Sequence, residues 1–152
     1  MTTRSRRAVV PAVALALALT GCSATNTITT QADYAASDGV RAELGDLRLG
    51  NLLVLTSAEG EVGTLIGSVT NDGSQDAAVD ILVGESTTGL DVDAGSTVVL
   101  GSQDGEQVEI ESVPAPPGAF VAVTVTSDVG GTMTVRVPVL DGTLPEYADL
   151  VP

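Results

Sequence analysis

Apolar residues recur at every second position in short runs of this chain, and this alternation restricts its fold more than any other feature. Val121, Val123 and Val125 share one parity, and residues 133–139 repeat the pattern with Thr and Arg between the apolar positions. Successive side chains of a β-strand point to opposite faces, so such a run has one apolar and one polar face. We therefore expect strands that bury one face in a core.

Eight runs of this kind follow one another, separated by turns rich in Gly, Asp, Asn and Pro. They cover residues 47–55, 64–70, 79–83, 90–92, 97–100, 108–110, 121–125 and 133–139. Gly50–Asn51 interrupts the first run, where we expect a β-bulge. A short helix could form only within residues 31–44, where Gly39 weakens it. Short strands at this spacing are typical of a two-sheet sandwich or a small barrel.

The first residues of the chain have the order of an export signal. Arg4, Arg6 and Arg7 precede thirteen uncharged residues at positions 8–20. This run is shorter than the roughly 20 residues that a membrane-spanning helix needs. We therefore interpret residues 1–21 as a cleavable signal peptide, which fits the general secretory route better than the twin-arginine route.

Leu19, Thr20, Gly21 and Cys22 resemble the lipobox of bacterial lipoproteins. The resemblance implies that Leu19, Thr20 and Gly21 are recognised by a signal peptidase, which cleaves before Cys22. It also implies a covalent diacylglycerol on Cys22, which with a further acyl chain holds a protein stably to a membrane. The alternative is an ordinary secreted protein whose one Cys has no role, although an unpaired Cys in an exported protein needs its own explanation.

The chain beyond Cys22 divides into three predicted parts. Residues 22–40 are rich in Ser, Thr, Ala and Asn and are interpreted as a flexible, lipid-anchored tether. The strand pattern predicts a β-sandwich domain over residues 41–141. Residues 142–152 are expected to form a C-terminal tail.

Charge and composition exclude several classes of function. Three of the six Arg precede Cys22 and all 20 acidic residues follow it, so the chain from Cys22 onward has a net charge of −17. This charge repels nucleic acid and anionic headgroups, so no nucleic-acid partner is expected. The chain has no Lys and no His, so a Ser or Thr nucleophile would have only carboxylates as bases. We expect no enzyme activity, and a paired-carboxylate site is a minor alternative.

Clustered acids raise the question of a calcium site. Asp72, Asp76 and Asp80, or Asp91 with Asp93, carry the oxygen ligands that calcium prefers. Alternation within a strand and solvated turns account for these acids without a metal. Met133 has the parity of a core residue, and without His it cannot form a soft-metal site alone. We expect no metal site, and no cofactor besides the lipid.

Four segments together resemble a known family. They are residues 38–40 (DGV), 45–51 (GDLRLGN), 63–73 (GTLIGSVTNDG) and 144–150 (LPEYADL), and they resemble the LpqE-type lipoproteins of actinobacteria. That family is distantly similar to the PCu(A)C periplasmic copper chaperones. The resemblance implies an all-β fold, a single immunoglobulin-like or cupredoxin-like β-sandwich of about eight strands. It also implies a partner, the respiratory supercomplex. The His and Met copper ligands of the chaperones have no counterparts here.

These observations lead to one expected function and one alternative. The expected function is that of a noncatalytic accessory or binding module, lipid-anchored at the outer face of the cytoplasmic membrane and hence extracytoplasmic. Its expected partners are the membrane itself, through the lipid, and a membrane protein complex such as the respiratory supercomplex. The alternative is a metal-handling lipoprotein, either copper chaperone-like or calcium-binding.

Overall fold

Strands account for every regular element that the structure describes. The computed structural model describes residues 38–102 and 105–152. Its elements are β1 (Val40–Leu44), β2 (Leu47–Thr56), β3 (Gly63–Asn71), β4 (Ala77–Val83), β5 (Ser86–Val92), β6 (Thr97–Leu100), β7 (Glu109–Ile110), β8 (Phe120–Ser127) and β9 (Gly131–Leu140). In this part of the chain no helix is long and apolar enough to cross a membrane. The predicted all-β class is confirmed.

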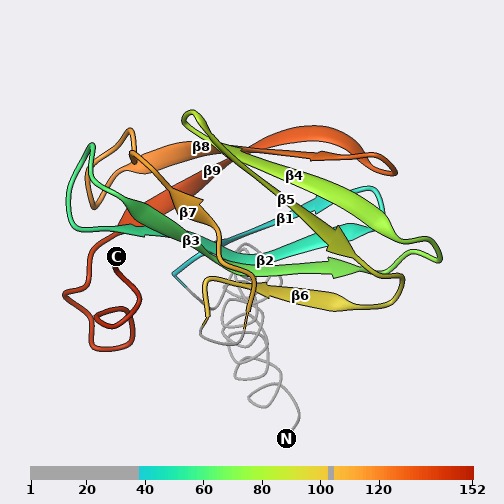
Figure 1. Ribbon diagram of the computed structural model, residues 1–152, viewed down its shortest axis with the longest axis horizontal. Helices are drawn as coiled ribbons and strands as arrows, with labels where there is room; N and C mark the ends of the chain where they lie inside the picture. Colours follow the sequence, from blue (N-terminus) through green and yellow to red (C-terminus); the bar gives the residue numbers. More distant parts are fainter. Residues whose placement is uncertain (1–37, 103–104) are drawn as a thin grey trace, which may run out of the picture. The chain divides into compact units, whose positions relative to one another are not determined.

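The strands form two layers that share β9. The first layer, called the β4 sheet, has the order β5-β4-β8-β9, and the second, called the β2 sheet, contains β1, β2, β3, β6 and β7. Figure 1 shows β4, β8 and β9 on one side and β2, β3 and β6 on the other. The end of β9 crosses between the layers, because Val139 and Leu140 pair in parallel with Val54 and Leu55 of β2. The β-sandwich expected from the sequence is confirmed.

The core lies between the layers and follows the predicted parity. Val123 and Val125 of β8 are fully buried, and Val121 is 5% exposed. On β9 the C-terminal residues of the apolar set are fully buried, whereas Met133 and Val135 are partly buried and pack against the core. Met133 therefore has the core role that its parity predicts.

The first strand replaces part of the predicted helix. Residues 40–44 form β1, which pairs with β2 in antiparallel fashion through Ala42 and Leu49. The expectation of a helix reaching Leu44 is wrong, because pairing with β2 supplies partners for the backbone groups and the β-branched Val40 favours a strand. Residues 31–37 of that prediction lie outside the described part.

The predicted bulge decides which residues of β2 enter the core. The register between β2 and β3 shifts between Gly50 and Leu53, and Asn51 adopts a left-handed φ of 51°. One extra residue in a strand moves the following side chains to the opposite face. Leu52 therefore faces the main core, while Leu53 and Leu55 face the other side of the sheet.

A second, smaller apolar cluster lies on the outer side of the β2 sheet. Leu53 and Leu55 are fully buried there and Ile66 is 8% exposed. They are covered by Leu140, the last residue of β9, and by Tyr147, Leu150 and Val151, which follow that strand. Residues 144–152, called the C-terminal strap, thus fold back onto the sheet (Figure 1).

Candidate functional site

The residues with a predicted chemical role lie outside the described part of the chain. Leu19, Thr20, Gly21 and Cys22 all precede residue 38, where the described structure begins. Lipid attachment at Cys22 and cleavage before it therefore stay predictions. The described part begins at Asp38, near the predicted boundary between tether and domain.

The junction at Asp38 and Gly39 is held by two side chains from distant parts of the chain. The Gly39 amide donates a hydrogen bond of 3.1 Å to Oδ1 of Asn51. The Tyr147 hydroxyl donates one of 2.9 Å to Oδ2 of Asp38, across 109 positions of sequence. A Cβ at Gly39 would lie 2.5 Å from the backbone carbon of Asn51, so only Gly allows this close approach. Contacts with β2 and with the residues after β9 therefore hold the junction in place.

Tyr147 is placed by the fold of the strap. Hydrogen bonds from Thr143, first from its side chain and then from its amide, lower the pKa of the exposed Asp141 carboxyl, and the amide donates to Oδ1 of Asp141 at 2.9 Å. The amides of Tyr147 and Ala148 then both donate to the Leu144 carbonyl, at 3.0 and 3.1 Å, which closes a turn. The pKa of Tyr147 is raised, first by burial and then by its hydrogen bond to Asp38 and the negative charges nearby. Its phenol therefore stays protonated and able to donate.

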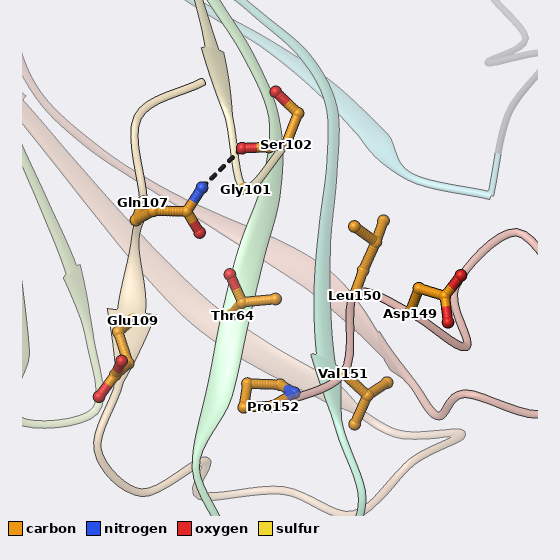
Figure 2. Close-up of a pocket in the computed structure, with 9 residues that line it drawn as sticks. All are labelled: Thr64, Gly101, Ser102, Gln107, Glu109, Asp149, Leu150, Val151 and Pro152. Carbon is orange, nitrogen blue, oxygen red and sulfur yellow. Dashed lines mark hydrogen bonds between the residues drawn. The ribbon is translucent and has the colours of Figure 1, made fainter. Parts of the chain in front are cut away.

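A pocket of about 340 Å³ lies at the end of the strap, bordered by Thr64, Gln107 and Glu109 on one side and Asp149 on the other. Figure 2 shows Glu109 and Asp149 on opposite sides of the opening, pointing away from each other. The Gln107 side-chain amide donates a hydrogen bond of 2.6 Å to the Ser102 carbonyl. The two carboxylates of this pocket therefore do not face a common reacting atom, as paired acid and base groups must.

A hollow of about 500 Å³ lies on the outer face of β1, β2 and β3. Gly50, Arg41 and Arg48 are among the residues that line it. Arg48 is engaged by Asp72, with 2.6 Å between Nε and Oδ2 and 3.1 Å between Nη2 and Oδ1. Both partners of this pair are more than half exposed, so it contributes at most about 1 kcal/mol.

The acids that could have held calcium are dispersed by the fold. Asp72 pairs with Arg48, Asp76 accepts the Ala94 amide at 2.9 Å, and Asp80 lies on the outer face of β4. Within residues 38–102 and 105–152, no three His, Cys, Asp or Glu side chains lie close enough to share a metal ion.

The junction and the strap are the parts that the sequence pattern missed. One signal was present, because residues 52–55 are four consecutive apolar residues. A strand with one solvated face alternates, whereas a continuous apolar run indicates burial on both faces. That signal indicates a cover over β2 but does not say which segment provides it.

Comparisons with known proteins identify solved structures with a similar fold. No family model and no curated protein sequence matches the chain. Solved structures do match: the apo PCuAC domain from PmoF1 (TM-score 0.56, 11% identity), the copper-bound PCuAC domain from PmoF2 (0.54, 16%) and the apo PmoF2 PCuAC domain (0.55, 15%). These matches cover 66–69% of this chain and 98% of each domain. The predicted distant similarity to PCuAC domains is therefore confirmed at the level of the fold, which this chain shares with them.

Proposed function

We propose that this chain is a noncatalytic exported lipoprotein that presents a β-sandwich binding module at the outer face of the cytoplasmic membrane. Diacylglycerol on Cys22 holds it there. The observation that carries this proposal is the fixed junction, in which Asn51 binds Gly39 and Tyr147 binds Asp38. These two contacts hold the domain end of the predicted tether against the sandwich, so the module is attached to its tether at a defined place on the fold.

The side-chain chemistry of the domain supports the noncatalytic part of the proposal. The chain has no His and no Lys, and the carboxylates of the pocket at the strap diverge. The aliphatic core leaves the surface, the edge strands and the turns for function. The partner that we propose is a membrane protein complex, and the resemblance to LpqE-type lipoproteins favours the respiratory supercomplex.

Replacement of Cys22 tests the anchor. Cys22→Ala should abolish lipid labelling and leave the protein as an unprocessed precursor, measured by metabolic labelling with a fatty acid and by intact-protein mass spectrometry. Cys22 is the only Cys of the chain, so no other thiol can take the lipid. Ser23→Ala, one position along, is the matched control and should be lipidated normally. A lipid-bearing Cys22→Ala protein would contradict the proposal.

Purification from gently solubilised membranes tests the accessory role. The wild-type lipoprotein should bring a membrane complex with it, and mass spectrometry should identify the same subunits under several mild detergents. The copurified set should be lost with Cys22→Ala. A wild-type protein that is recovered alone under every mild detergent would contradict the accessory role while leaving the anchor intact.

The second candidate function is metal handling. The observation that favours it is the shared fold with PCuAC domains, of which one was solved with copper bound. In this chain, however, Met133 packs against the core and the described acids are dispersed. Calorimetric titration with Cu(I), Cu(II) and Ca²⁺ separates the two functions. Stoichiometric binding with a sub-micromolar Kd would favour metal handling, and binding no stronger than that of a chain with Met133→Leu would reject a copper site.

A further inference from the structure

We propose that the outer face of the β4 sheet is the surface through which two copies of this chain associate. The side chains that point outward on β4, β8 and β9 are small and largely uncharged. The central ones, called the threonine face, are Leu82, Ala122, Thr124, Thr126, Thr132 and Thr134. This face is on the opposite side of the sheet from the core that its strands share with the β2 sheet.

The hydroxyl groups of this face are already paired with one another. Thr124 and Thr134 lie opposite each other with their hydroxyl oxygens 2.9 Å apart, and Thr126 and Thr132 repeat the contact at 3.1 Å. A polar group that is already hydrogen-bonded costs less free energy to remove from water than a free one. These two threonine pairs, called the threonine ladder, therefore present mainly methyl groups to a partner.

Two large apolar side chains lie on or beside the threonine face. Leu82 is 38% exposed beside Thr124, and Phe120, the first residue of β8, is 52% exposed. Apolar surface of this kind gains free energy when it is covered. Phe120 is also an anchor of the aromatic type that is enriched at protein interfaces.

The charges at the margins of the face identify a second copy as the partner. Arg136 lies over the Phe120 ring, 5.0 Å from its centroid, and Asp80 lies on the other side of the ladder. Neither makes an ion pair with any other residue in the described part of the chain. Asp80 pairs with Thr126 and Arg136 with Ala122, so the two are separated by about 13 Å along the strands and cannot meet within one copy.

A two-fold axis between two copies can bring Asp80 of each copy opposite Arg136 of the other. In a symmetric dimer residue i of one copy contacts residue j of the other, and the reverse contact follows. An axis between Asp80 and Arg136 forms two reciprocal Asp80–Arg136 ion pairs on either side of the packed threonine ladders. Asp91, on the edge strand β5, and Asp128, which follows β8 and accepts the Ala78 amide, are further acids at the margin of this side of the sheet, so the uncharged part of the face is its threonine-rich centre.

The outer face of the β2 sheet is less suited to this contact. The C-terminal strap covers one part of it, and Arg48 is already engaged by Asp72. The threonine face has fewer residues than the 20–30 a side of a standard interface, so a dissociation constant of about 10–100 μM is expected.

Charge exchange tests the proposal on a soluble chain that begins at residue 23. The described residues belong to one compact unit whose core begins after residue 39, so this chain retains the fold. Sedimentation equilibrium should show a monomer–dimer equilibrium for the wild type. Asp80→Arg and Arg136→Asp should each raise the dissociation constant about tenfold or more. The double exchange restores both ion pairs and should return the constant to near the wild-type value.

Arg41→Asp makes the same charge change on the outer face of the other sheet and should leave the equilibrium unchanged. Thr124→Arg, at the centre of the face, should abolish association while circular dichroism shows an intact fold. A wild type that sediments as a monomer at millimolar concentration would overturn the proposal. So would a double exchange that associates no better than the single variants, or a dimer that Thr124→Arg leaves intact.

Discussion

Val123 shows how one side chain connects the sequence pattern to the fold. It lies between Val83 of β4 and Val135 of β9, and none of its side chain is exposed. Its neighbour Ala122 points to the other face and is exposed. The period-two pattern predicts both environments because the strand geometry alone assigns consecutive residues to opposite faces.

Val123→Asp should lower the free energy of unfolding by about 3–5 kcal/mol, because it leaves an unpaired charge in the core. That is a large part of the stability of a domain of this size, so the variant should be largely unfolded. Ala122→Asp is the control and should cost about 1 kcal/mol or less. Urea denaturation followed by circular dichroism measures both. A Val123→Asp protein with a wild-type midpoint would contradict the assigned parity.

Asn51 has one role that the local sequence predicts and a second role that it does not. Gly50–Asn51 was predicted as a bulge from composition, and the register shift confirms it. Asn tolerates the left-handed backbone better than other residues with a side chain, which explains its presence at φ 51°. Its second role, as acceptor for the Gly39 amide, depends on a contact across 12 positions that no local pattern indicates.

At the scale of elements, the structure differs from the predicted elements at the two ends of the domain. The first five strand residues, β1, were predicted to end a short helix, yet they pair with β2. The strap was predicted as a tail, and the structure places it over Leu53 and Leu55. The central strands alternate clearly and were predicted, because burial on one face imposes a period that is readable locally. The ends have no such period.

Removal of the Tyr147 hydroxyl tests how the strap is held. Tyr147→Phe removes the hydrogen bond to Asp38 and should lower the free energy of unfolding by about 1 kcal/mol. Because the pKa of Tyr147 is raised in the folded state, the folded protein holds this proton more tightly than the unfolded chain. Its contribution is therefore complete below the ordinary tyrosine pKa and is lost as pH rises above it.

The measurement is urea denaturation of both proteins from pH 7 to pH 11. The difference in stability between wild type and Tyr147→Phe should be constant up to about pH 9 and then shrink, since tyrosine titrates near pH 10. Tyr34 is present in both proteins and cancels from the comparison. A difference that grows with alkaline pH would mean that the strap is not held by the protonated phenol.

At the scale of the whole molecule, charge is the dominant feature. Eighteen of the 20 acidic residues lie in the described part of the chain, together with three Arg. The described part contains one ion pair, Arg48 with Asp72, and it is exposed. Folding therefore brings many like charges closer together with little compensation, and self-repulsion destabilises the compact state.

Salt should consequently stabilise this protein. Raising NaCl from about 0.02 to 0.5 M shortens the distance over which charges interact from roughly 20 Å to 4 Å, and the free energy of unfolding should rise by about 1–2 kcal/mol. Urea is the suitable denaturant, because guanidinium is itself a salt. Arg41→Glu replaces a positive with a negative charge at an exposed position, which lowers the net charge by two and should steepen the dependence. A stability that falls with salt would show that local ion pairs outweigh the net charge.

The sequence by itself determined the all-β class, the parity of the core residues, the bulge in β2 and the absence of His and Lys chemistry. Each is a local or compositional property. The parity of the core, for example, is visible in the sequence because alternate residues of a strand face opposite sides. Only the tertiary structure decided that β9 joins the two sheets beside β2, that the strap covers Leu53 and Leu55, and that Tyr147 meets Asp38. These contacts join segments up to 109 positions apart, and their free energy depends on surfaces that exist only after both segments have folded.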